Sequence, residues 1–186
     1  MTKLYSDKDI KIIEDNIGNI IDSARRKELE LLEPTLDEFK QVHNYILDYV
    51  KKNKRIIYGG WAWNSLIKHK NPEDVFYKKD LIDKPDIEFY SFIPIVDLTN
   101  LCNELHYKGF KNIQGKEANH DETYTLFINF QPYCDITYMP KNIFHKMPLY
   151  KIDGFLYSHP KFILIDVLRM YNDPLTSYWR IEKNVK

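Results

Sequence analysis

The sequence of 186 residues is poor in cysteine and carries no excess of charge of either sign. Its two cysteines, Cys102 and Cys134, favour buried free thiols over a disulfide or a metal pair, and such usage suits a reducing compartment. Lys and Arg number 27, and Asp and Glu also number 27. This balance excludes a globally basic protein, so any contact with a nucleic acid must be local.

Long apolar runs are also missing from the sequence. No segment approaches the roughly 20 apolar residues that a membrane span requires, and the first residues contain no apolar core of a signal peptide. We therefore expect a soluble, cytoplasmic protein without a membrane partner. The length fits one buried core, alone or with a helical extension.

Periodic patterns predict an ordered mixture of helices and strands. Isoleucines at helical spacing predict a helix over 4–32 that Pro34 ends, and Thr35 with Glu38 forms a capping box for a second helix to Lys52. Further strands are expected at 55–58, around Asp86, and at 112–117, 124–130 and 133–139. Further helices are expected at 61–69, from Pro94 to a stop at Gly109, at 160–171 and from Pro174. Asp153-Gly154 predicts a hairpin turn.

Two acids alternate with apolar residues in the segment Pro-Asp-Ile-Glu-Phe-Tyr at 85–90. Successive strand side chains point to opposite faces, so Asp86 and Glu88 share one face. A third acid, Asp135, stands in a second strand-like segment at 133–138. Convergent carboxylates are the ligands that two Mg²⁺ ions use to clamp the oxygens of a phosphoryl-type transfer. The plainer interpretation of each acid is a solvated surface residue.

A diglycine, Gly59-Gly60, separates a predicted strand from a predicted helix. Such a turn brings backbone N–H groups and the positive end of the helix dipole to a triphosphate, although it also serves as a plain tight connection. Asn64, one turn into the helix, is a candidate for a phosphate or sugar contact or for a local backbone hydrogen bond. Lys161, at the start of a later helix, is a candidate triphosphate ligand or a solvent-facing lysine.

Four segments in this order resemble the poly(A) polymerase catalytic subunits of large cytoplasmic DNA viruses, which belong to the nucleotidyltransferase superfamily with a DNA polymerase β type palm. The segments are Tyr-Gly-Gly-Trp-Ala-Trp-Asn at 58–64, Asp-Ile-Glu-Phe-Tyr-Ser at 86–91, Cys-Asp-Ile-Thr-Tyr-Met-Pro at 134–140 and Asp-Pro-Leu-Thr-Ser-Tyr-Trp-Arg at 173–180. One departure is the insert between Gly60 and Asp86, which is longer than usual in the superfamily. The inserted part, at 70–84, is polar and contains Asn71-Pro72, so it predicts an extended loop.

The resemblance implies an α+β nucleotidyltransferase palm with a mixed sheet backed by helices and preceded by N-terminal helices. The order of predicted elements favours the same class, with helices on one face of the sheet and the acids at the other. We expect residues 1–53 to form an N-terminal helical segment packed on the palm, and 54–186 to form the palm. We also expect truncation on the C-terminal side, because the last residues carry no helix stop signal.

The function implied by the resemblance is template-independent addition of adenylate to an RNA 3′ end, with ATP as substrate and two Mg²⁺ or Mn²⁺ ions as cofactors. The implied catalytic and metal-binding residues are Asp86, Glu88 and Asp135, and the implied nucleotide-binding residues are Gly59, Gly60, Asn64 and Lys161. Expected partners are ATP and the RNA 3′ end, with a homo-oligomer or a further subunit left open, in the host cytoplasm or a virion. One alternative is transfer to a protein or small-molecule acceptor, which the zero net charge favours. A second alternative is a non-catalytic palm-like interaction or oligomerisation module.

Overall fold

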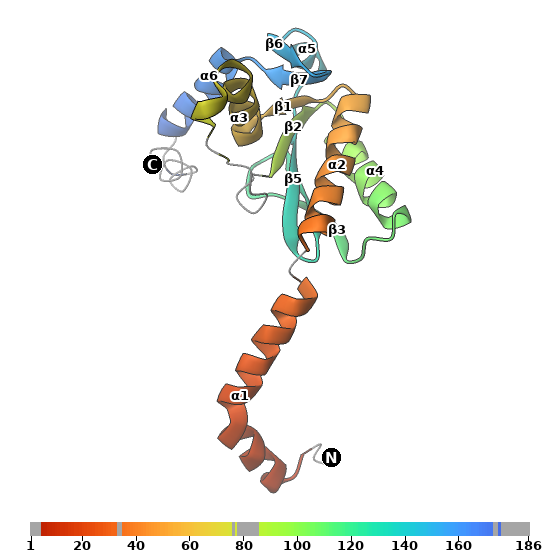
Figure 1. The fold of residues 1–186 in the computed structure, drawn as a ribbon, viewed down its shortest axis with the longest axis vertical. Coiled ribbons are helices and arrows are strands. Elements are labelled where there is room, and N and C mark those ends of the chain that lie inside the picture. Colours follow the sequence, from red (N-terminus) through yellow and green to blue (C-terminus); the bar gives the residue numbers. More distant parts are fainter. Residues whose placement is uncertain (1–4, 33–34, 76, 78–85, 173–174, 176–186) are drawn as a thin grey trace. The chain divides into compact units, whose positions relative to one another are not determined.

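The computed structural model describes residues 5–32, 35–75, 77, 86–172 and 175. The expected helix from Pro174 and most of the insert at 78–85 lie outside the described residues. Along the chain the elements are α1 (Asp7–Leu32), α2 (Leu36–Lys52), β1 (Ile56–Tyr58), α3 (Gly59–Lys70), a 3-10 helix η1 (Pro72–Asp74), β2 (Ile87–Ser91), α4 (Pro94–Tyr107), β3 (Ile113–Glu117), β4 (Thr123–Ile128), β5 (Gln131–Tyr138), α5 (Lys141–Phe144), β6 (Leu149–Ile152), β7 (Phe155–Ser158) and α6 (Pro160–Asn172) (Figure 1).

The chain divides into two compact units, Met1–Pro34 and Thr35–Lys186. The first unit contains α1, whose isoleucines are exposed; they are Ile10, Ile12, Ile13, Ile17, Ile20 and Ile21, at 39–53%. The division after Pro34 differs from the boundary after residue 53 that the sequence predicted. Helix α2 belongs to the second unit because Val42, Ile46 and Val50 on its inner face are fully buried with the sheet residues.

The second unit is built on a seven-stranded sheet in the order β3-β4-β5-β2-β1-β7-β6. Strand pairs β2–β5 and β1–β7 are parallel, and the other pairs are antiparallel, so the predicted mixed sheet is confirmed. Helices α2 and α4 lie side by side against the sheet (Figure 1). Ile87 and Phe89 of β2 are fully buried in the core that these helices close. Glu88, the residue between them on β2, therefore faces the other side of the sheet.

Local signals in the sequence account for several element boundaries. The Thr35 side chain accepts the backbone N–H of Glu38 (3.1 Å), as the capping box predicted. Pro94 occupies the first turn of α4, where its missing N–H costs nothing. The β6–β7 hairpin turns at Asp153 and Gly154, which both have positive φ and so confirm the predicted turn.

Three elements differ from the sequence prediction in detail. Helix α3 begins at Gly59 itself, so the diglycine is the first turn of the helix and not a loop before it. The insert predicted as a wholly extended loop contains the 3-10 helix η1, which Pro72 starts. The four-residue helix α5 was not predicted, because so short a segment shows no helical periodicity.

A buried ion pair ties α2, β1 and α4 together. Arg55, next to β1, donates through Nε and Nη2 to the Asp97 carboxylate of α4 (2.6 and 2.8 Å), and the Tyr49 hydroxyl of α2 donates to the same carboxylate (2.8 Å). The exposed fractions of Arg55 and Asp97 are 7% and 1%. Because the carboxylate receives three hydrogen bonds, its burial is compensated, and the pair fixes both helices against the start of β1.

Candidate active site

The sheet brings two of the predicted acids, Glu88 and Asp135, together on the face opposite the buried side chains of β2. Strands β2 and β5 run parallel with Glu88 directly paired to Asp135, and Asp86 immediately precedes β2. All three acids are half-buried. Neighbouring strands lie about 4.8 Å apart, so the Glu88 and Asp135 backbones present their carboxylates side by side. This register places Asp135 beside Glu88; it does not include Asp86, whose shared face with Glu88 stays a prediction.

The diglycine turn closes over Glu88. The backbone N–H of Gly60 donates to Glu88 Oε2 (2.9 Å), and Tyr58, the last residue of β1, pairs in register with Glu88. Gly59 has φ +64°, and a Cβ built on it would overlap Glu88 Oε2 and stand 2.8 Å from Oε1. A side chain at position 59 is therefore disfavoured by the backbone conformation and would displace the Glu88 carboxylate. The diglycine turn and Glu88 form one structural unit.

Asp135 is held from the opposite side by a threonine. Thr125 on β4 pairs directly with Asp135, and its hydroxyl donates to Asp135 Oδ1 (2.6 Å). Further along the same strands, the Thr137 hydroxyl bonds to those of Thr123 (3.0 Å) and Tyr58 (2.6 Å). These hydroxyl contacts cross β4, β5 and β1 on the face that carries the acids.

The negative charges of the acids act on the same neighbouring groups. Burial, reinforced by the charge of Glu88, raises the pKa of Tyr58 well above its ordinary value. Burial, and then the charges of Asp135 and Asp86, raise the pKa of the Cys134 thiol. Cys134 directly precedes Asp135 on β5 and pairs with Ile87, the residue after Asp86. Both groups therefore remain neutral at pH 7. The site is electronegative, which favours a cation.

The two remaining predicted nucleotide contacts are placed differently. The Asn64 side chain on α3 accepts the backbone N–H of Tyr77 (3.2 Å), so it makes a backbone hydrogen bond that reaches the insert. Lys161 is exposed at the start of α6, and its backbone N–H donates to Nδ1 of His159 (3.1 Å). Among the described residues, the structure gives the Lys161 side chain no partner near the acids. A role for either residue toward a nucleotide stays a prediction.

The donor set suits a hard divalent cation in kind, because carboxylate oxygens are the ligands that Mg²⁺ and Mn²⁺ take in proteins. Across residues 5–32, 35–75, 77, 86–172 and 175, however, no group of three His, Cys, Asp or Glu side chains stands ready to hold a metal ion. Glu88 accepts a hydrogen bond from Gly60 and Asp135 accepts one from Thr125, and a carboxylate that accepts one hydrogen bond keeps lone pairs for a cation. The backbone places the ligands together, and their side chains are bonded to the protein.

Two residues of the site were missed at the level of sequence. Thr125 and Tyr58 contact Asp135 and pair with Glu88, respectively, but each is an ordinary strand residue in the sequence. The alternation Thr-Tyr-Thr at 123–125 could have placed both threonines on one strand face. It could not have named Asp135 as the partner, because that requires the register of β4 on β5.

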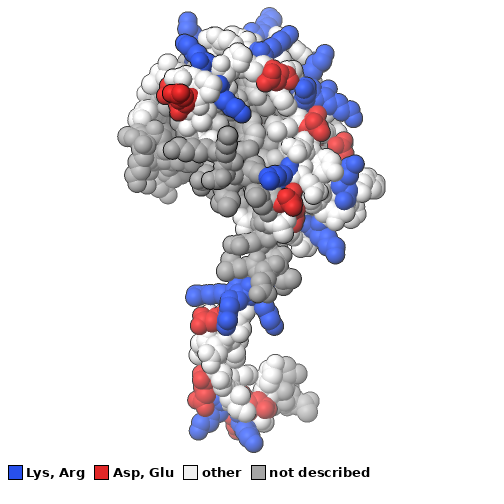
Figure 2. Space-filling view, in the orientation of Figure 1, with Lys and Arg blue, Asp and Glu red and all other residues white. Residues whose placement is uncertain are grey.

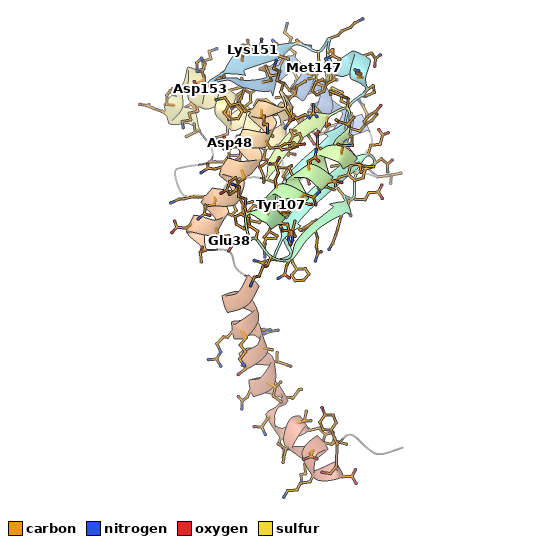
Figure 3. The ribbon with its side chains drawn as sticks, turned by 90° about the vertical axis from the view of Figure 1, so that its right-hand side faces the viewer. Glu38, Asp48, Tyr107, Met147, Lys151 and Asp153 are labelled. Carbon is orange, nitrogen blue, oxygen red and sulfur yellow. The ribbon has the colours of Figure 1, made fainter. Side chains whose placement is uncertain are left out.

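Basic side chains gather on α5, β6 and the start of α6. Residues 141–161 contain four lysines, Lys141, Lys146, Lys151 and Lys161, and only one acid, Asp153. Figure 2 shows blue side chains along the upper end of this face, where Figure 1 places β6 and α5. Lys151 and Asp153 lie at the hairpin end of the second unit, far from Glu38 at the start of α2 (Figure 3). The zero net charge thus conceals a local basic region.

The chain is similar to proteins of large DNA viruses. The pattern of a family described as "Poly(A) polymerase catalytic subunit" matches residues 44–177. A protein of Acanthamoeba polyphaga mimivirus assigned as a poly(A) polymerase catalytic subunit is 45% identical over 173 residues, which are 93% of this chain and 29% of that protein. A protein of African swine fever virus with the same assignment is 26% identical over 125 residues, 67% of this chain and 26% of that protein.

A solved structure agrees with these sequence matches. The crystal structure of the Megavirus polyadenylate synthase superposes with a TM-score of 0.73 at 45% identity, over 95% of this chain and 35% of that one. This match confirms the predicted α+β fold with a mixed sheet. The chain spans about a third or less of the length of these relatives.

No described helix is both long enough and apolar enough to cross a membrane.

Proposed function

Because the chain belongs to the poly(A) polymerase catalytic subunit family, a family of nucleotidyltransferases, we propose that it carries the catalytic palm for template-independent addition of adenylate from ATP to an RNA 3′ end. The single observation that carries this proposal is the register of Glu88 beside Asp135, with Asp86 preceding and the diglycine turn closing over Glu88. That arrangement joins a phosphate-binding turn to a cluster of oxygen ligands.

In the proposed reaction the RNA 3′-hydroxyl oxygen attacks the α-phosphorus of ATP in line. A new P–O bond forms to the RNA, the bond to the β-phosphate oxygen breaks, and pyrophosphate leaves. Asp135 assists removal of the hydroxyl proton, while Gly59 and Gly60 receive the triphosphate at the start of α3. Most of the acceleration comes from positioning and charge neutralisation, as in other phosphoryl transfers.

Two divalent ions, Mg²⁺ or Mn²⁺, fit the proposal as cofactors held by Asp86, Glu88 and Asp135. When bound, they would neutralise the charge that develops on the phosphate oxygens. Glu88 accepts the N–H of Gly60 through Oε2, and because a carboxylate has more lone pairs than this hydrogen bond uses, it can bind a metal ion while the hydrogen bond persists. We propose Asn64 and Lys161 as further nucleotide contacts, and the cytoplasm of the host cell or a virion as the place of action.

RNA contact is supported by the basic stretch at 141–161, which offers local attraction to a polyanion despite the neutral chain. The neutral charge also keeps transfer to a protein or small-molecule acceptor as a second candidate. The intact acids disfavour a non-catalytic module, since mutually repelling carboxylates on one face have a cost that a metal ion offsets. Association with a second copy or a further subunit remains part of the proposal, because the relatives are named as catalytic subunits.

The test is an extension assay with the chain, a labelled RNA primer, each NTP in turn, and Mg²⁺ or Mn²⁺. We expect 3′ extension with ATP. Asp86→Asn, Glu88→Gln or Asp135→Asn should each lower the extension rate by at least about 100-fold. This loss is larger than the loss of about 10- to 100-fold that is typical when a residue that only supports a metal ligand is replaced. Asp48→Asn is the matched control, because Asp48 is exposed on α2 (Figure 3), and α2 packs on the face of the sheet opposite Glu88. Near-normal transfer by all three site variants would reject the site. Label that enters protein in the absence of RNA would favour the second candidate.

A further inference from the structure

Thr125 is the residue that holds Asp135 in place. It sits on β4, directly opposite Asp135 on β5, and its Oγ1 donates to Asp135 Oδ1 at 2.6 Å. Only 7% of Thr125 is exposed, so water competes weakly for this hydrogen bond. A hydroxyl that donates to a carboxylate at this distance makes one of the stronger hydrogen bonds in proteins.

The contact fixes the orientation of the carboxylate. An aspartate side chain rotates about its terminal bond with a broad preference, so its two oxygens are not positioned by the backbone alone. With Oδ1 engaged by Thr125, the second oxygen is defined in space on the face that Asp135 shares with Glu88. Groups that orient a metal ligand from behind are needed for full metal affinity.

We propose that Thr125 is a positioning residue for the proposed transfer: its hydroxyl orients the Asp135 carboxylate for a divalent cation and for the attacking RNA hydroxyl. The role toward the RNA hydroxyl rests on the proposed function. The role toward the cation needs only that Asp135 takes part in binding a divalent cation.

The chain supplies a matched control two residues away on the same strand. Thr123 lies on the same face of β4 as Thr125, and only 4% of it is exposed. Its hydroxyl bonds to that of Thr137 (3.0 Å) and not to an acid. Thr123→Val and Thr125→Val each remove one hydrogen bond of a threonine that is buried to a similar extent. A difference between the two variants therefore isolates the contact with Asp135.

The first measurement is Mn²⁺ binding by electron paramagnetic resonance, without nucleotide or RNA. We expect Thr125→Val to weaken Mn²⁺ affinity by about 10- to 100-fold, Thr125→Ser to restore most of it, and Thr123→Val to match wild type. Urea unfolding of the two valine variants shows whether each folds. If Thr125→Val and Thr123→Val change Mn²⁺ affinity equally, or if Asp135→Asn leaves it unchanged, the inference is wrong.

The second measurement is the extension assay on the same set. Thr125→Val should lower kcat and leave the KM for ATP near its wild-type value, because in the proposed reaction the triphosphate contacts the diglycine and not Asp135. Wild type that binds Mn²⁺ through Asp135 but extends no RNA would overturn the proposed function and leave the metal-positioning result standing. Active wild type with Thr125→Val indistinguishable from Thr123→Val would overturn the inference alone.

Discussion

Replacing Gly59 with alanine tests whether the diglycine turn and the acids are one unit. Two features make this position sensitive: its φ of +64°, and the Glu88 carboxylate, which occupies the place of a Cβ. The added methyl group must either push the carboxylate away or distort the turn. Either movement breaks the hydrogen bond between the Gly60 N–H and Glu88.

The expected cost has two parts. Placing an alanine in the left-handed region costs about 1–2 kcal/mol. Losing a hydrogen bond to a charged carboxylate costs about 1.5–3 kcal/mol. We therefore expect Gly59→Ala to lower the free energy of unfolding by about 2.5–5 kcal/mol.

Gly109 supplies the control for the backbone part. It also has positive φ, at +94°, but a Cβ built on it meets nothing within 4 Å. Gly109→Ala should therefore cost only the conformational part, about 1–2 kcal/mol. Urea unfolding followed by circular dichroism gives the midpoint and slope for both variants.

A double-mutant cycle then isolates Glu88. In a Glu88→Ala background the carboxylate no longer occupies the space, so Gly59→Ala should cost about as much as Gly109→Ala. A cost of Gly59→Ala equal to that of Gly109→Ala in the wild-type background would refute the reasoning. So would a Gly59→Ala cost that Glu88→Ala does not reduce.

Two further predictions concern the core and the alkaline limit. Asp97→Ala leaves the buried Arg55 guanidinium without its carboxylate and should lower the free energy of unfolding, measured in urea, by about 3–5 kcal/mol. A loss smaller than that caused by Asp48→Ala, at an exposed aspartate, would show that the buried ion pair does not stabilise the fold. Burial, with the charge of Glu88, raises the pKa of Tyr58, so the native state holds that proton more tightly than the unfolded chain. This stabilisation is complete below about pH 10 and is lost as the pH rises toward the raised value. The free energy of unfolding of Tyr58→Phe should therefore fall less steeply with pH above about pH 10 than that of the wild type. An unchanged dependence on pH would show that Tyr58 does not cause the alkaline loss of stability.

Much of the fold could be predicted because short-range signals determine it. The N-cap of Thr35 and the Asp153-Gly154 turn each act within a few residues, and the structure contains both. The mixed sheet also followed from the order of elements. The domain boundary was less accessible: α2 carries a helical pattern like that of α1, and only tertiary packing of Val42 and Ile46 assigns it to the sheet.

The candidate site divides in the same way. Alternation placed Asp86 and Glu88 on one face, and the structure pairs Asp135 with Glu88. The side-chain contacts could not be predicted, because they depend on strand register and on φ at one residue. The hold of Gly60 on Glu88 and the hydroxyl of Thr125 on Asp135 are both of this kind.

The parallel pairing of β2 with β5 also constrains how the protein is made. Glu88 and Asp135 belong to segments that are separated in the chain by α4, β3 and β4, so their meeting closes a long loop. Contacts of this range form slowly during folding. On the ribosome, the acids cannot meet until β5 has emerged. Glu88 and Asp135 therefore come together when β2 pairs with β5 at the centre of the sheet. The appearance of cation binding during refolding would report the rate of that step.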